Sequence, residues 1–128
     1  METRAEIESI LDKAYAARRS NDADAAAGCF TDDGCFREIG GPPTTNRAEQ
    51  HVALKAVFEA FALLEFREHC RVIDPPRAVV HWRGKFRARN GREAEADILD
   101  LIEVRDGRIA SLTTFFDTSY AANLAAPA

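Results

Sequence analysis

The sequence predicts an α+β domain in which three helices come first and an antiparallel sheet follows. Apolar residues recur at helical spacing in the first half of the chain. From residue 64 onward apolar and polar residues alternate, and short turn signals separate the alternating runs. Helices segregated to one side of an antiparallel sheet form an α+β domain. We expect the whole chain, residues 1–128, to form one such domain.

Each predicted helix has its own start signal. Thr3 opens the first helix as part of a Thr-Arg-Ala-Glu capping box, and helical spacing continues to about Arg19. Tyr15 lies on the apolar face of this helix. Asp22 opens a second, short helix, and Asn46 opens the third. The third helix has an apolar stripe made of Leu54, Val57, Phe58 and Phe61.

The strands are predicted from period-two alternation. A turn at residues 31–34 leads into a short strand, 35–39, in which Phe36 and Glu38 share one face. The rest of the chain is then predicted to form a four-stranded meander, with strands at 64–73, 77–89, 93–104 and 108–118. The Asn-Gly pair at 90–91 and the Asp-Gly pair at 106–107 are hairpin turn signals. We expect the tail, 119–128, to fray.

Charge and hydropathy exclude several classes of partner. The net charge of −4 argues against general affinity for nucleic acid. The basic residues Arg83, Lys85 and Arg87 alternate on one strand face, which is typical of a solvated or dimer-facing surface. No apolar run is long enough to cross a membrane, and the N-terminus lacks a signal-peptide pattern. We therefore expect a cytoplasmic protein.

The cysteines and histidines do not predict a metal site. The three cysteines are odd in number and lack the CxxC spacing, so free thiols in a reducing compartment are expected. A zinc site needs clustered cysteine and histidine ligands, which the spacing of the three histidines does not indicate. We expect neither a metal nor another cofactor. The residues concerned are Cys29, Cys35, Cys70, His51, His69 and His81.

A carboxyl group on an apolar strand face is the strongest functional signal. Asp100 alternates in phase with Ile98, Ile102 and Val104, so its side chain should point into the core. Burying a carboxylate is costly, and the usual response is a raised pKa that keeps the acid neutral. Such acids in clefts are candidates for functional sites. The alternative is a structural ion pair with an arginine such as Arg18.

Tyr15 and Glu38 are also expected to point inward. A helical tyrosine on an apolar face is usually a core residue with a bonded hydroxyl. Glu38 could instead end its strand in solvent beside Arg37. A curved sheet with helices in its concave face leaves a pocket between the layers, and such pockets are common ligand sites. Three inward polar groups therefore make that pocket the predicted site.

The sequence resembles the ketosteroid isomerase-like branch of the nuclear transport factor 2-like superfamily, which includes SnoaL-like polyketide cyclases. The resemblance covers most of the chain and rests on the motifs AYAARRSNDADAAAGCFTDDGCFREIGGPP and DILDLIEVRDGRIASLTTFFDT. It implies a cone-shaped curved sheet. It also implies cofactor-free proton abstraction α to a ketone, with Glu38 as base and Tyr15 and a protonated Asp100 binding the enolate oxygen. This use of a neutral aspartic acid is a known example for ketosteroid isomerase itself.

Other branches of the superfamily offer different chemistry. The epoxide hydrolases of the superfamily use a set of two acids and an arginine, but Ile98 occupies the position of that arginine here. SnoaL-like cyclases use an acid near the end of the sheet, for which Asp117 is the candidate, although Asp117 could simply cap the next segment of the chain. A non-catalytic domain that binds a small molecule is the remaining alternative.

The expected ligand is an apolar small molecule. Aromatic side chains suit flat apolar ligands, and several are predicted to wall the pocket. By resemblance, the protein is expected to be a homodimer through the outer face of the sheet. The predicted substrate-binding residues are Phe58, Phe61, Trp82, Phe86, Phe115 and Asp117.

Overall fold

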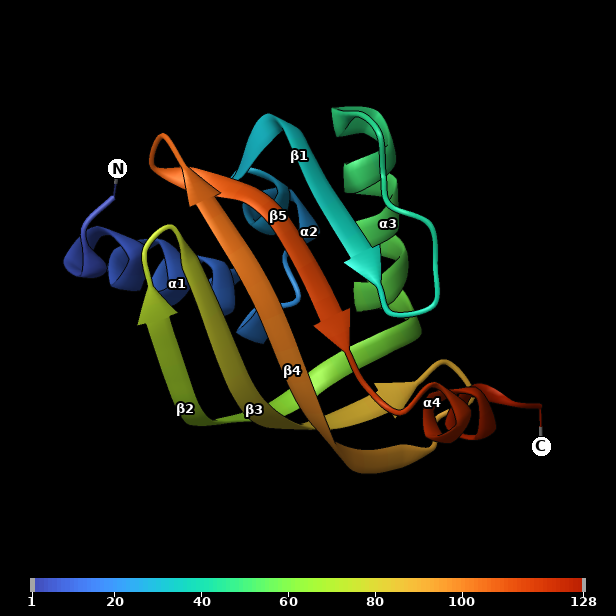
Figure 1. Ribbon diagram of the computed structural model, residues 1–128. Helices are drawn as coiled ribbons and strands as arrows, with labels where there is room; N and C mark the ends of the chain where they lie inside the picture. The colour runs from blue at the N-terminus through green and yellow to red at the C-terminus, as the bar shows by residue number, and fades with distance from the viewer. Residues whose placement is uncertain (1, 128) are drawn as a thin grey trace.

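The computed structural model describes residues 2–127 and contains four helices in that range (Figure 1). The helices are α1 (Arg4–Arg19), α2 (Ala23–Ala27), α3 (Arg47–Ala60) and α4 (Thr118–Ala125). Thr3, Asp22 and Asn46 are the N-caps of α1, α2 and α3, and each side chain accepts a hydrogen bond from a backbone N–H of the first turn. The predicted starts of the three helices are confirmed.

Five strands form one curved sheet in the order β1-β5-β4-β3-β2. They are β1 (Phe30–Glu38), β2 (Phe61–Asp74), β3 (Arg77–Ala88), β4 (Glu93–Arg105) and β5 (Arg108–Phe115). Strands β2 to β5 are the predicted antiparallel meander. In the turn between β4 and β5, Asp106 and Gly107 both have positive φ angles, as a tight hairpin turn requires. The predicted α+β architecture is confirmed.

Two segments differ from the sequence prediction. The predicted turn at 31–34 is wrong, because β1 begins at Phe30 and continues through that segment. This strand pairs in parallel with β5, and the pairing register shifts between Phe30 and Cys35. Polar residues at this irregularity produced the turn-like pattern. The predicted frayed tail is also wrong for most of its length, because Asp117 caps a final helix, α4, by accepting from the Tyr120 N–H. Residue 128 of that tail lies outside the described residues.

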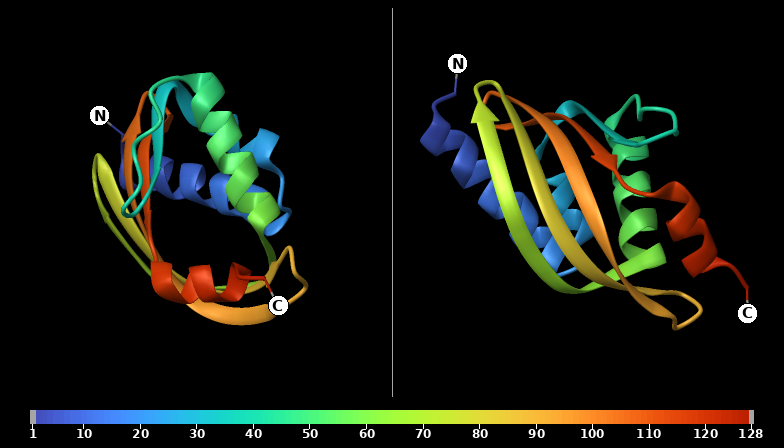
Figure 2. Two further views of the ribbon diagram at one scale, coloured as in Figure 1. Left: turned by 90° about the vertical axis from the view of Figure 1, so that its right-hand side faces the viewer. Right: turned by 60° about the horizontal axis from the view of Figure 1, so that its bottom comes forward.

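The first three helices lie in the concave face of the sheet, and α4 lies at one end of it (Figure 2). Alternation in β3 places Val80, Trp82 and Phe86 in the core and leaves the intervening residues toward solvent. In β4 the same alternation buries Ile98, Asp100 and Ile102, as the sequence predicts. Within residues 2–127, no helix has the length and apolar character needed to cross a membrane.

Candidate active site

Three polar side chains form a row across the inner face of the sheet. Glu38 on β1 is the register partner of Thr114 on β5, and Thr114 is also the partner of Asp100 on β4. Register partners in neighbouring strands point to the same side of a sheet. All three residues line one cavity, so two carboxyl groups from distant parts of the chain face the same space.

Asp100 is buried at one end of this row. Its Oδ2 atom accepts a hydrogen bond from the Tyr15 hydroxyl at 2.5 Å and another from the Trp82 indole N–H at 2.9 Å. Burial raises the pKa of Asp100, and the side chains of Tyr15, Trp82 and Thr114 partly oppose this effect. The direction agrees with the predicted neutral acid.

Tyr15 is held by aromatic contacts with the sheet. Its ring packs against Phe66 and Trp82, with centroid distances of 5.5 and 6.2 Å. Burial and the neighbouring Asp100 raise the pKa of Tyr15 well above its ordinary value. The hydroxyl therefore stays protonated and can donate a hydrogen bond.

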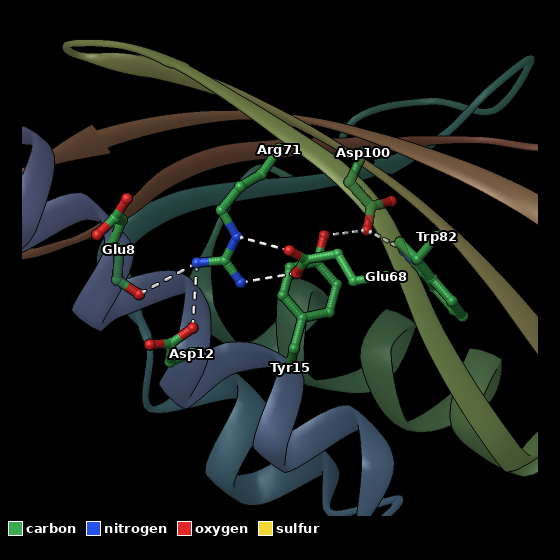
Figure 3. A network of polar contacts seen from close by, with 7 residues as sticks. All are labelled: Glu8, Asp12, Tyr15, Glu68, Arg71, Trp82 and Asp100. Atoms are coloured by element: carbon green, nitrogen blue, oxygen red, sulfur yellow. Dashed lines mark hydrogen bonds and ion pairs between the residues drawn. The ribbon is translucent and has the colours of Figure 1, made fainter.

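An ion network next to Tyr15 fixes α1 against β2 (Figure 3). Arg71 on β2 pairs with Asp12 on α1 at 3.0 Å and with Glu68 on its own strand at 2.7 Å. It also approaches the Glu8 carbonyl oxygen at 3.5 Å. The Arg71 side chain is only 17% exposed, so solvent screens these contacts less than at an open surface. The network sets the position of the helix turn that carries Tyr15.

Glu38 is half-buried at the other end of the row. Burial raises the pKa of its carboxyl group. Within residues 2–127, no hydrogen bond or ion pair forms at the Glu38 side chain. A raised pKa and a free carboxylate are the properties of a general base that must approach a substrate proton.

The cavity has a volume of about 140 Å³ and an almost entirely apolar wall. Phe58, Phe61, Trp82 and Phe86 line it, where the sequence analysis placed them. The placement of Phe115 in the cavity wall is corrected by the structure. Phe115 pairs with the exposed Leu99, which puts its side chain on the outer sheet face. Phe116, one residue further on, lines the cavity instead.

Asp117 also lines the cavity, at the junction of β5 and α4. One carboxylate oxygen accepts the Tyr120 N–H at 2.9 Å, so the residue is a helix cap. Tyr120 and two further α4 residues, Ala121 and Leu124, contribute to the wall. The helix that the sequence analysis treated as a fraying tail therefore closes part of the cavity.

Arg18 does not form the ion pair with Asp100 that the sequence left open. Its guanidinium donates to the Phe61 carbonyl oxygen at 3.0 Å and to Asn21 Oδ1 at 3.3 Å. It also lies 4.3 Å from the centroid of the Phe58 ring. Burial lowers the pKa of Arg18 to about 10, and the Asp100 carboxyl acts in the opposite direction. Arg18 lines the cavity as a buried cation.

The polar roles of Trp82 and Thr114 in the site were not predicted. Trp82 was expected only as an apolar wall, but its indole N–H is a hydrogen-bond donor to Asp100. Thr114 was not singled out, although alternation from Leu112 along β5 would have placed it inward. Ile98, at the place of the epoxide hydrolase arginine, is a buried apolar part of the wall.

These groups can stabilise a developing oxyanion and move a proton. A buried neutral acid and a phenol can both donate to one ligand oxygen. A half-buried carboxylate in the same row can accept a proton from a carbon next to that oxygen.

The family is decided by a match of the SnoaL-like domain model to residues 11–112. The chain belongs to the SnoaL-like domain family. The match includes Tyr15, Glu38 and Asp100, and it confirms the resemblance to the nuclear transport factor 2-like superfamily. No curated protein matches this SnoaL-like domain significantly.

Solved structures share the fold of this SnoaL-like domain. A protein from Jannaschia sp. CCS1, proposed to be a SnoaL-like polyketide cyclase, has 13% identity and a TM-score of 0.84 over 100% of this chain and 99% of its own. A proposed isomerase from Bacillus subtilis has 14% identity and a TM-score of 0.85 over 97% and 95%. TerC, co-crystallized with polyporic acid, has 21% identity and a TM-score of 0.79 over 94% and 97%. At these identities the likeness shows the fold alone.

Proposed function

We propose that this SnoaL-like domain is a cofactor-free enzyme that removes a proton α to the carbonyl of a small cyclic ketone and returns it at another carbon. The observation that carries the proposal is the arrangement around Asp100. A buried acid with a raised pKa accepts hydrogen bonds from Tyr15 and Trp82 in the wall of an apolar cavity, and Glu38 faces the same cavity.

The reaction starts with the ketone oxygen accepting a hydrogen bond from the protonated Asp100 carboxyl and a second one from Tyr15, whose single hydroxyl proton turns from Asp100 Oδ2 to the ketone when substrate binds. The Glu38 carboxylate takes a proton from the α carbon, and the C–H electron pair forms the carbon–carbon double bond of an enolate. The negative charge collects on the oxygen, where the two donors stabilise it. For a β,γ-unsaturated ketone, Glu38 then returns the proton to the γ carbon. The product is the conjugated ketone, and the enzyme is unchanged.

The cavity volume indicates the size of the reacting group. About 140 Å³ is close to the volume of an engineered apolar cavity that binds benzene. The walls therefore surround about one ring, and any further part of a substrate would extend through the opening. The aromatic side chains favour a flat, apolar ring system.

The test uses 3-cyclohexen-1-one, whose conversion to the conjugated 2-cyclohexen-1-one is followed by ultraviolet absorbance. Wild-type protein is expected to catalyse the conversion. Asp100→Asn is expected to keep much of the activity, because an amide also donates a hydrogen bond. Asp100→Ala removes the donor and is expected to lose about 10²- to 10³-fold in kcat. Equal, full activity in both variants would remove Asp100 from the mechanism.

A ring closure of the SnoaL type is the second candidate, and family membership favours it. An aldol closure also begins with an enolate, so Glu38, Tyr15 and Asp100 would keep their roles. Asp117, the acid considered for a cyclase, has one oxygen committed to capping α4. A substrate that carries a second carbonyl group within reach of the enolate carbon distinguishes closure from isomerisation, because only closure consumes that carbonyl.

A binding-only domain is distinguished by 2-naphthol, which mimics an enolate. Under the enzymatic proposal, naphthol binds the wild type, binding weakens in Asp100→Ala, and ketones turn over. Under the binding-only alternative, Glu38→Gln binds naphthol as the wild type does and no ketone turns over in either protein. Fluorescence titration of naphthol measures the binding.

We also propose a homodimer through the outer sheet face, in a reducing cytoplasm. Val72 and Leu101 are exposed apolar residues in one row of that face, and Leu99 lies in the next row. The free thiols Cys29, Cys35 and Cys70 support the reducing compartment. Sedimentation of the wild type and of Leu101→Lys tests the dimer, because a buried lysine would split it.

A further inference from the structure

Two histidines and an aspartate come together on the outer face of the sheet, away from the cavity. His69 lies on β2, His81 on β3 and Asp97 on β4. One potential ligand atom of each residue lies within 4.8 Å of the other two. These residues are 12 and 16 positions apart in the sequence, so only strand pairing assembles the cluster.

A β-bulge in β2 contributes to the cluster. Glu68 pairs with Trp82 and Cys70 pairs with His81, so β2 has one extra residue between these two pairs. His69 is that extra residue, and both it and Cys70 are exposed. His81 is flanked by the buried Val80 and Trp82, which fixes its side chain on the outer face. The bulge therefore lets two consecutive residues of β2 face His81.

We propose that His69, His81 and Asp97 bind a divalent transition-metal ion such as Zn²⁺. Imidazole nitrogen and carboxylate oxygen are established zinc ligands, and in a tetrahedral site they lie roughly 3.3 Å apart. His81 Nε2 is 3.3 Å from Asp97 Oδ1, and His69 Nε2 is 3.9 Å from the same oxygen. Because His69 is exposed, its side chain can rotate to bring Nε2 closer to Asp97 Oδ1.

Asp97 is held in the orientation that this site needs. Arg83 donates from Nη1 to Asp97 Oδ2 at 3.0 Å, which leaves Oδ1 directed at the two imidazoles. Support of this kind for a ligating carboxylate is usual at metal sites. In the single chain the site is open to solvent on the outer face, which is also the face proposed for the dimer, and a water molecule would complete the four ligands.

His51 provides a matched control on the same protein. Its Nε2 lies 2.5 Å from Asp24 Oδ1, so it also has a histidine–carboxylate contact at the surface. His51 belongs to α3 and is not part of the His69 cluster. A histidine–carboxylate contact without a second imidazole should not bind zinc to the same extent.

The experiment is an isothermal titration of Zn²⁺ into protein freed of any histidine tag. We expect one ion per chain in the wild type. His69→Ala and His81→Ala are each expected to weaken binding at least about tenfold, because losing even a residue that only supports a ligand costs about 10- to 100-fold. His51→Ala is expected to bind as the wild type does. Binding to all four proteins with equal affinity, or no saturable binding to the wild type, would overturn the proposal.

Two further measurements identify the ligands. Co²⁺ in place of Zn²⁺ should give the visible absorption of a four-coordinate site in the wild type and lose it in His81→Ala. Cys70→Ser should leave both the absorption and the affinity unchanged. If Cys70→Ser abolishes binding and His69→Ala does not, the thiol is the ligand and our assignment is wrong. None of these residues lines the cavity, so the result is independent of the proposed enzymatic activity.

Discussion

The polar row across the inner sheet face has one carboxyl group at each end, and the surroundings of these two groups differ. Asp100 is 4% exposed and accepts hydrogen bonds from Tyr15 and Trp82. Glu38 is half-buried, and within the described residues its side chain makes no hydrogen bond or ion pair. Burial raises the pKa of both acids, but only at Asp100 do neighbouring donors oppose the shift.

This difference separates two roles that one kind of side chain can have. An acid that must stabilise charge works best when its position is fixed before the reaction, because little reorganisation is then needed. An acid that carries a proton between two carbon atoms must be free to move. The Asp100 end has the first property and the Glu38 end has the second.

The largest effect is expected at Glu38. Glu38→Gln cannot accept a proton, so kcat for 3-cyclohexen-1-one should fall by about 10²- to 10⁴-fold. The folded structure should be unchanged, because the side chain makes no polar contact in residues 2–127. Glu95→Gln is the control and should keep full activity, because Glu95 is an exposed residue of β4 that does not line the cavity. If Glu38→Gln keeps full activity as well, the base is another group.

The second largest effect is expected at the Asp100 end of the row, where Tyr15 donates a hydrogen bond. Tyr15→Phe removes one donor and should lower kcat by about 10²- to 10³-fold, with little change in KM for a weakly bound ketone. Steady-state kinetics separate the two constants. A rise in KM with an unchanged kcat would mean that Tyr15 only binds the substrate, and the contrast between the two ends would disappear.

A third test concerns the charge of Asp100. A pKa raised by folding means that the folded chain binds more protons than the unfolded chain. The resulting stability is present below the unfolded pKa and is lost as pH rises through the folded pKa. The stability of Asp100→Asn relative to wild type should therefore increase in urea unfolding as the pH rises above about 4, the ordinary pKa of an aspartic acid. A constant difference would show that Asp100 is ionised in the folded protein.

The smallest effect is expected at α4, which lines the same cavity. Asp117→Ala removes the cap of this helix and should lower the free energy of unfolding by about 1 kcal/mol. Asp117→Asn should stay close to wild type, because asparagine caps equally well. Amide hydrogen exchange in α4 should accelerate in the alanine variant alone. Equal exchange in the two variants would mean that packing, and not the cap, holds α4.

Local patterns in the sequence were sufficient to predict which way the side chains of Tyr15 and Asp100 point. Alternation in β4 placed Asp100 inward, and helical spacing in α1 placed Tyr15 on the buried face. Residues two to four positions apart determine such patterns, because strands and helices repeat at those intervals. The same reasoning failed at residues 31–34, the first part of β1, where a register shift interrupted the alternation.

Contacts between distant segments depended on the complete fold. Tyr15 and Asp100 are 85 positions apart, and the hydrogen bond between them exists because α1 packs across the sheet. Glu38 faces the same cavity because β1 pairs in parallel with β5, which no local pattern indicated. The bulge in β2 likewise brought His69 to His81 although their spacing indicated no site.

The amino-acid order alone specified the first three helices, the meander and the inward faces that carry Tyr15, Glu38 and Asp100. Folding of the whole chain settled which of these faces meet, how α4 closes the cavity and where the outer histidines lie. The two levels differ because backbone periodicity depends on near neighbours, whereas strand order and register depend on the burial of side chains from the whole chain.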